Sequence, residues 1–206
     1  MDHVPQSPYL RALGTQRTQL HPALREYFSA VPRGHLGIGE GVFERIGTPR
    51  RWLWPLLRMM ERSGVVHSGW HQNVPFTVRN RTLAGKAISA RTLHLSDGDW
   101  TMKDAVCVRP RGRVLDQIGE PMTLAVAFDV SVDGDALALR STTVGIRLGR
   151  VRITVPKFLA PVVRLRESAE KRAGRQRVSL TVDLPVIGRL YEYEGTFSYA
   201  IHEDAP

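Results

Sequence analysis

Apolar and polar residues alternate with a period of two along most of the chain after residue 73. In the clearest example, residues 122–132, every second side chain is apolar, from Met122 to Val132. Such alternation predicts a β-strand with one face in the core. The same pattern predicts strands between Val74 and a turn at Ala84-Gly85, and at 87–95, 100–108, 114–118, 136–148, 163–170, 177–184 and 189–201. Residues 35–47 also alternate and predict one strand nearer the N-terminus.

Short turns join these predicted strands, so strands that follow one another in the sequence should pair antiparallel. Ser96-Asp97-Gly98-Asp99 and Asp133-Gly134 contain the residues that tight hairpin turns favour. About ten consecutive strands tend to curl and close, because closure removes exposed strand edges. The sequence therefore predicts a mainly β (α+β) fold in a single domain, residues 1–206. We expect an up-and-down antiparallel barrel, or a strongly curled sheet, of about ten strands.

The first third of the chain instead has the spacing of helices. Ser7-Pro8 and Thr48-Pro49 each place a capping side chain before a proline, which is a common helix start. Helices are predicted from Pro8, at 21–29 and at 49–62. Residues 1–65 would then be mostly helical with one strand, and residues 74–201 would form the barrel. We expect the two or three helices to pack on one opening or one face of the barrel.

Composition narrows the class of protein. With 42% hydrophobic and 24% charged residues in a chain of 206, the sequence is typical of an ordinary globular domain. The single cysteine, Cys107, excludes an internal disulfide, and residues 1–10 lack the basic and apolar regions of a secretory signal. We therefore expect a cytoplasmic protein.

The net charge of +9 would suit a polyanionic partner. However, 25 of the 29 basic residues are arginines spread along the chain, a bias that a GC-rich genome also produces. The sequence has no helix-turn-helix, zinc-finger or aromatic RNA-binding pattern, so no nucleic-acid partner is expected. Dinucleotide and phosphate-loop motifs are missing, and His67 and His71 have no third ligand within sequence reach. We expect no metal and no cofactor.

Three acidic residues fall on the apolar side of predicted strands. Asp104, Asp116 and Glu167 each alternate in phase with apolar neighbours, so a barrel would turn them inward. Burying a carboxyl group is costly unless the group is paired or used. One interpretation pairs each of them with an arginine such as Arg91 or Arg140. The other places them in a ligand cavity, where desolvation would raise their pKa and suit them to proton transfer.

The cavity interpretation makes aromatic side chains the wall of a binding site. The expected ligand-binding residues are Trp100, Met102, Phe128, Arg140, Tyr191, Tyr193 and Tyr199, with Asp104, Asp116 and Glu167 as orienting or catalytic groups. The expected function is the binding of a hydrophobic small molecule or lipid. One alternative is a cofactor-free cyclase or isomerase that folds a polyene or polyketide chain and uses one carboxyl as general acid or base. Another is a structural or partner-binding domain with a filled core.

The predicted helix 49–62 carries an apolar stripe that includes Trp52, Leu56 and Met59, with arginines on the opposite side. Such a stripe usually packs against a core. It would also suit the surface of a membrane, so peripheral membrane contact through helix 49–62 is a further expectation.

Several stretches of the chain resemble the bacterial family called domain of unknown function 4166. They are VPFTVRN from Val74, RGRVLDQIG from Arg111, ITVPKFLAPVVRLRES from Ile153 and LPVIGRLYEYEGTF from Leu184, with SPYLRALG near the start. Members tend to carry Trp-x-Arg-x-Phe where this chain has Trp100, Met102 and Asp104. They tend to carry Glu where Asp116 stands, and Glu167 agrees with an acidic position of the family. The family has no settled activity, so the resemblance implies no catalytic residue.

Overall fold

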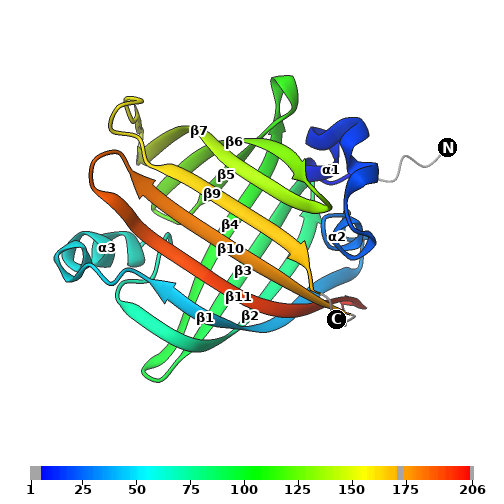
Figure 1. The fold of residues 1–206 in the computed structure, drawn as a ribbon, viewed down its shortest axis with the longest axis horizontal. Coiled ribbons are helices and arrows are strands. Elements are labelled where there is room, and N and C mark those ends of the chain that lie inside the picture. The colour runs from blue at the N-terminus through cyan, green and yellow to red at the C-terminus, as the bar shows by residue number, and fades with distance from the viewer. Residues whose placement is uncertain (1–5, 171–173, 205–206) are drawn as a thin grey trace.

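The computed structural model describes residues 6–170 and 174–204, and eleven antiparallel strands lie within them. They are β1 (His35–Gly47), β2 (Trp70–Leu83), β3 (Lys86–Leu95), β4 (Gly98–Arg109), β5 (Arg113–Ile118), β6 (Met122–Asp133), β7 (Ala136–Leu148), β8 (Val151–Thr154), β9 (Val162–Ala169), β10 (Arg175–Leu184) and β11 (Gly188–Glu203). Strands that follow one another in the sequence pair, except β8 with β9. In addition, β7 pairs with β9, and β1 pairs with β11. These pairings close ten strands into a barrel (Figure 1). The predicted ten-stranded antiparallel barrel is confirmed.

Two features of the barrel differ from the sequence expectation. The strand expected in the N-terminal part, β1, lies between β2 and β11 and is a full member of the barrel. The division into a helical part, 1–65, and a barrel, 74–201, is therefore not a structural boundary. The short strand β8 was not predicted. It pairs only with residues 145–148 of β7, outside the closed ring, and all four of its residues are exposed.

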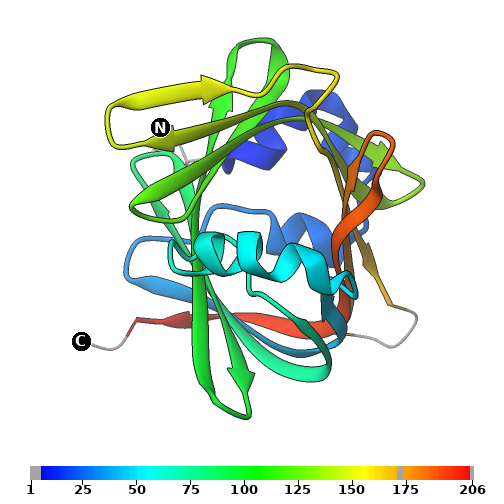
Figure 2. The same ribbon diagram turned by 90° about the vertical axis from the view of Figure 1, so that its left-hand side faces the viewer.

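Three short α-helices lie within the described residues, and they occupy both ends of the barrel. They are α1 (Pro8–Leu13), α2 (Pro22–Tyr27) and α3 (Trp54–Glu61). Ser7 caps α1 as predicted, since its side chain accepts a hydrogen bond from the amide of Leu10. Figures 1 and 2 show α1 and α2 at one end and α3 across the opposite opening. The helices are thus divided between the two openings.

The third helix is shorter than its sequence pattern predicts. A single 3-10 turn, Arg51–Leu53, precedes it, and Pro55 occupies its first turn, where proline is tolerated, so it causes no kink. Only Leu53 and Leu57 of this segment are buried. Most of the expected apolar stripe, including Trp52, Leu56 and Met59, faces outward. No helix in the described ranges is long and apolar enough to cross a membrane.

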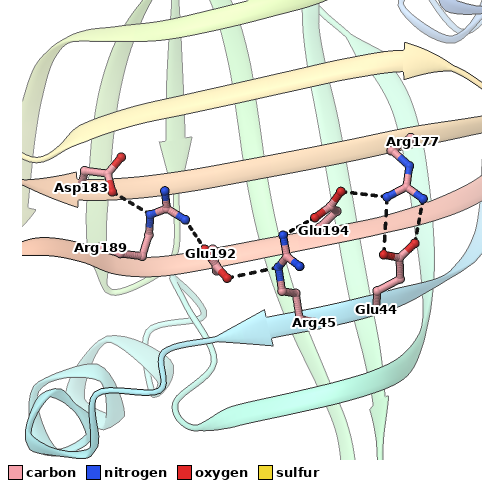
Figure 3. A network of polar contacts seen from close by, with 7 residues as sticks. All are labelled: Glu44, Arg45, Arg177, Asp183, Arg189, Glu192 and Glu194. Carbon is pink, nitrogen blue, oxygen red and sulfur yellow. Dashed lines mark hydrogen bonds and ion pairs between the residues drawn. The ribbon is translucent and has the colours of Figure 1, made fainter.

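Outer and inner side chains alternate along β11, whereas its pairings with β1 and β10 contain irregularities at Phe43/Arg45 and Val182/Asp183. Figure 3 shows seven outer side chains in a continuous chain of ion pairs: Glu44, Arg45, Arg177, Asp183, Arg189, Glu192 and Glu194. Each of the three arginines contacts at least two carboxylates; Arg177, for example, is 2.8 Å from Glu194 and 2.9 Å from Glu44. Because Glu192 and Glu194 face outward, the intervening Tyr193 faces the interior, where it is buried.

Glycines bring β1 and β11 close together. A Cβ atom on Gly41 would lie 2.2 Å from the carbonyl oxygen of Thr196, and one on Gly195 would lie 2.4 Å from that of Val42. A Cβ on Gly37 would overlap the ring of Tyr199. The alternating glycines of β1 therefore leave room inside the barrel for aromatic side chains of the neighbouring strand.

Candidate functional site

The barrel encloses a cavity of about 180 Å³. The wall of the cavity is mainly aliphatic and aromatic. The cavity extends from α3 at one opening of the barrel toward α1 and α2 at the other. Val65 and Val66, which follow α3, line one part of it, and Tyr27 and Phe28 of the α2 segment line another. Native interiors rarely hold voids larger than one water molecule, whereas this space equals roughly six waters at ~30 Å³ each. The barrel interior therefore holds a cavity larger than an ordinary packing void.

Three carboxyl groups face this cavity, as their alternation predicts. Asp104 on β4, Asp116 on β5 and Glu167 on β9 all line it. The antiparallel register pairs Val106 of β4 with Asp116, which places Asp104 and Asp116 on the same side of adjacent strands. Glu167 comes from a part of the wall that is not adjacent, because β9 pairs with β7 and β10. The barrel thus brings together three acids that the sequence separates widely.

Of the two arginines that line the cavity, Arg91 offsets these acids, whereas Arg81 pairs with Asp204. Arg91 on β3 lines the cavity and is the register partner of Met102 on the adjacent strand β4. Its guanidinium lies 5.8 Å from the ring centre of Tyr193. Its positive charge favours the ionised form of each of the three carboxyl groups. The sequence analysis named Arg91 only as a pairing residue. Arg91 shares one side of β3 with Ser89 and Leu93, and this shared inner side is the sequence signal that could have placed it in the site.

Burial nevertheless dominates the proton affinity of the acids. Desolvation raises the pKa of Asp104 to about 6 and that of Glu167 to about 7, against the opposing charge of Arg91. Desolvation and the nearby Asp104 together raise the pKa of Asp116 well above its usual value. One arginine cannot neutralise three carboxylates in an apolar wall, so protons are retained. We call the three acids the proton reservoir, because burial raises the pKa of each and brings the pKa values of Asp104 and Glu167 close to neutral pH.

Most of the expected ligand-binding residues line the cavity, namely Trp100, Met102, Phe128, Tyr191 and Tyr193. Tyr199 lies beyond it, half-buried, with its ring edge-on to Tyr27 at a centroid distance of 4.7 Å. Two tyrosines that the sequence analysis did not select, Tyr9 and Tyr27, line the cavity from the helical segments. No strand alternation marks them, because helices carry them to the opening of the barrel.

The structure corrects the expected position of Arg140, which is exposed on the outer surface. Leu137 and Leu139 of β7 are buried before an irregularity in the pairing with β6, and Val144 is buried after it. The extra residue at this point reverses which side of the strand faces inward. Arg140 would share the inner side with Val144 in a regular strand, but the reversal turns it outward.

A second polar cluster lies between α3 and the barrel. The Nδ1 atom of His67 contacts the carboxylate of Glu61, and the Nε2 atoms of His67 and His71 are 3.2 Å apart. Ser68 donates a hydrogen bond to Glu61 at 2.5 Å, and the indole of Trp100 donates to the Glu61 carbonyl at 3.2 Å. Burial lowers the pKa of His67, which favours a neutral ring. These contacts fasten the end of α3 to β4.

Metal ligands do not gather in either cluster. Within residues 6–170 and 174–204, no group of three or more histidine, cysteine, aspartate or glutamate side chains is arranged to hold a metal ion. The chemistry that the cavity can perform with its own side chains is proton exchange and hydrogen bonding to a guest.

Comparison with known proteins places these features in a family. Uncharacterized protein YndH of Bacillus subtilis (strain 168) is 26% identical over 190 residues, which cover 86% of this chain and 90% of that protein. No solved structure gives a significant match. The family model described as Domain of unknown function (DUF4166) matches residues 20–197. This range contains strands β1–β10 in full, β11 except for its last residues, and all three carboxyl groups of the cavity. On that match over most of its length, the chain belongs to the DUF4166 family.

Proposed function

We propose that the protein binds a hydrophobic small molecule, or the apolar end of a lipid, inside the barrel. The cavity carries this proposal, because an enclosed apolar space of about 180 Å³ is the usual setting for such a guest. Sites for drug-sized molecules measure ~300–1,000 Å³. The guest that fits without movement of the wall is therefore small, or is one end of a longer chain.

The acids give the guest an orientation. The Oδ1 atom of Asp116 and the Oε2 atom of Glu167 are buried and accept no hydrogen bond from any residue that the structure describes. A buried acceptor without a donor is unfavourable by ~1–3 kcal/mol. A hydroxyl or amino group on the guest would supply the donor. We therefore place the polar end of the guest at Asp116 and Glu167, and its apolar part against Phe128 and Tyr193.

Narrowing the cavity tests the proposal. Ala87 lines the cavity, and Ala90 lies on the opposite side of the same strand. We expect N-phenyl-1-naphthylamine, a neutral fluorescent probe, to bind the wild type with enhanced emission. Ala87→Leu should weaken this binding by roughly tenfold or more, because the added carbons occupy the space of the guest. Ala90→Leu is the matched control and should bind like the wild type.

Two results would count against binding in the cavity. One is the absence of probe binding to folded wild-type protein, and the other is equal binding by the two leucine variants. The natural guest can be sought separately, by native mass spectrometry of protein purified from its own organism. An added mass that organic solvent removes, and that Ala87→Leu lacks, would identify its class.

A second candidate function is a cofactor-free cyclase or isomerase acting on a polyene or polyketide chain in the same cavity. The pKa values of about 6 for Asp104 and about 7 for Glu167 favour it, because a general acid or base works best near ambient pH. Asp104→Asn, Asp116→Asn and Glu167→Gln would separate the two functions. Loss of product with retained probe binding supports the enzyme, and unchanged conversion by all three variants excludes these acids as its catalysts.

The proposal keeps the expected cytoplasmic location and assigns no role to nucleic acid. The guest would then be an intracellular metabolite or a membrane lipid.

A further inference from the structure

Large apolar side chains are exposed together at the end of the barrel that α3 covers. They come from three separate segments: residues 48–69, residues 149–161 and the β10–β11 turn at 185–187. We call these three segments together the α3 end. The side chains are Trp52, Leu56, Met59, Val151, Ile153, Phe158, Leu159, Val186 and Ile187. Trp52 is 60% exposed and Phe158 is 74% exposed. Figures 1 and 2 agree that α3, β8 and this turn surround one opening.

Basic residues accompany these apolar groups. Residues 48–69 and 149–161 together contain six arginines and one lysine but only one acidic residue, Glu61. Glu61 is engaged by His67 and Ser68. Arg45, Arg177 and Arg189 on the barrel wall each contact at least two carboxylates (Figure 3). In contrast, within the described residues none of the seven basic side chains of the α3 end makes an ion pair.

Three of the arginines are grouped along α3. Arg51, Arg58 and Arg62 lie with Trp54, Pro55 and Met59 along one open face of the α3 segment. The guanidinium of Arg51 lies 5.9 Å from the ring centre of Trp54, which holds it beside the apolar side chains. Unpaired guanidinium groups next to apolar side chains match the chemistry of a lipid phosphate above its acyl chains.

We propose that the α3 end docks on the surface of an anionic lipid bilayer. The exposed apolar side chains enter the headgroup region, and the basic residues contact lipid phosphates. Charge complementarity favours an anionic lipid surface, because residues 48–69 and 149–161 carry seven basic side chains, against Glu61 and the acidic Asp97 and Glu120 of the adjoining turns. Membrane-surface segments combine apolar insertion with cationic flanks in the same way. This inference does not depend on what the cavity holds, although docking would bring α3 and the opening beneath it to the membrane.

Vesicle sedimentation tests the proposal directly. Wild-type protein should sediment with vesicles of equal parts phosphatidylcholine and phosphatidylglycerol, and much less with pure phosphatidylcholine. High salt should release it, because salt screens surface charge. Each basic residue near an anionic surface contributes roughly fivefold to binding, so Arg51→Glu, Arg58→Glu and Arg62→Glu together should weaken binding on the order of a hundredfold.

The opposite end supplies matched controls. Arg11, Arg17 and Arg25 are exposed near α1 and α2, and reversing them changes the net charge of the protein equally. That triple variant should keep most of the vesicle binding. Among apolar residues, Phe158→Ser should weaken binding, whereas Leu83→Ser, 68% exposed at the other end, should not. Thermal unfolding of each variant checks that it is folded.

The proposal fails if wild-type protein ignores anionic vesicles, or if both charge-reversal variants lose binding equally. Vesicle binding that survives both Phe158→Ser and the α3 arginine variant would also overturn it. So would capture of the α3 end by a protein partner in the absence of vesicle binding. Ala87→Leu, which narrows the cavity, should dock like the wild type. Failure of the cavity proposal and failure of the docking proposal are therefore distinguishable.

Discussion

At the scale of single residues, the barrel interior stores protons on groups that would release them in water. Glu167 is 4% exposed, and burial raises its pKa to about 7 from an ordinary value of 4.5. The folded protein therefore holds a proton on Glu167 at pH values where the unfolded chain has lost it. That proton links stability to pH.

The sign of this linkage gives a prediction. Between about pH 4.5 and 7 the native state binds more protons than the unfolded state at Glu167, so its contribution to stability is present at low pH and lost as pH rises. The loss is on the order of a few kcal/mol. Glu167→Gln removes this pH-dependent loss of stability. The free energy of unfolding of the variant, measured in urea, should therefore rise relative to that of the wild type between pH 5 and pH 8.

The same substitution at an exposed position of β11, Glu203→Gln, is the control for this measurement. It should leave the pH dependence of the wild type intact. A constant stability difference between Glu167→Gln and wild type across this range would show that Glu167 is ionised in the folded state throughout, and would remove it from the proton reservoir.

A glycine at the closing strand pair gives a second prediction. A Cβ on Gly41 would meet the carbonyl oxygen of Thr196 at 2.2 Å, and backbone atoms cannot rotate away. Gly41→Ala should therefore lower the free energy of unfolding by roughly 2–3 kcal/mol. Gly145→Ala, whose nearest contact would be 3.3 Å, should change it by less than about 1 kcal/mol. Equal effects of the two substitutions in chemical unfolding would contradict the close approach of β1 and β11.

Sequence reasoning located single residues wherever the alternation was regular. Asp104, Asp116 and Glu167 were identified because each replaces an apolar residue at an inward position. Arg140 was misplaced because one extra residue in β7 reverses the sides of the strand, and nothing in the local composition marks that irregularity. Tyr27 was missed because its position depends on how α2 meets the barrel rather than on a strand pattern.

At the scale of elements, α3 is held by few contacts. Leu53 and Leu57 are the buried apolar side chains of its segment, and Glu61 links its last turn to His67, Ser68 and Trp100. An eight-residue helix has little stability of its own. The Glu61 cluster therefore helps to hold the helix over the opening.

Removing the Glu61 side chain should loosen α3 alone, because its contacts with His67 and Ser68 are lost while the Trp100 bond to the backbone carbonyl remains. In Glu61→Ala we expect backbone amides of α3 to exchange with deuterium roughly tenfold faster, because the lost hydrogen bonds no longer oppose local opening. Amides of β1, β2 and β11 should exchange as in the wild type. Arg58→Ala, on the exposed side of the same helix, is the control. Unchanged exchange in α3 of the Glu61 variant would show that Leu53 and Leu57 hold it unaided.

The elements also show where local pattern stops being informative. Strands with one buried and one exposed side were predicted with nearly correct bounds. All four residues of β8 are exposed, so the strand has no alternation of burial to detect. Ser7 correctly marked the start of α1, but α3 begins six residues after the predicted cap at Thr48. The distribution of the helices between the two openings depends on the path of the chain around β1, which is a property of the closed barrel.

At the scale of the whole molecule, the wall and the two ends have different chemistry. The wall is charged outside and apolar inside, with arginines balanced by carboxylates on the outer face. The α3 end combines exposed apolar groups with unbalanced positive charge. A guest in the interior and a membrane at the α3 end would thus be recognised by separate surfaces. Ala87→Leu therefore tests the cavity alone, and the α3 arginine variant and Phe158→Ser test the α3 end alone.

The pairing of β1 with β11 also sets the order of events when the chain is made. Phe43 lies opposite Gly195, about 150 residues later. A ribosome therefore releases ten strands before it releases the one that joins the two open edges. Until then β1 and β10 expose unpaired backbone and the apolar lining behind it, which invites association with other nascent chains. A chain truncated before β11 would lack the strand that pairs with both edges, so we expect it to aggregate more readily than the full chain.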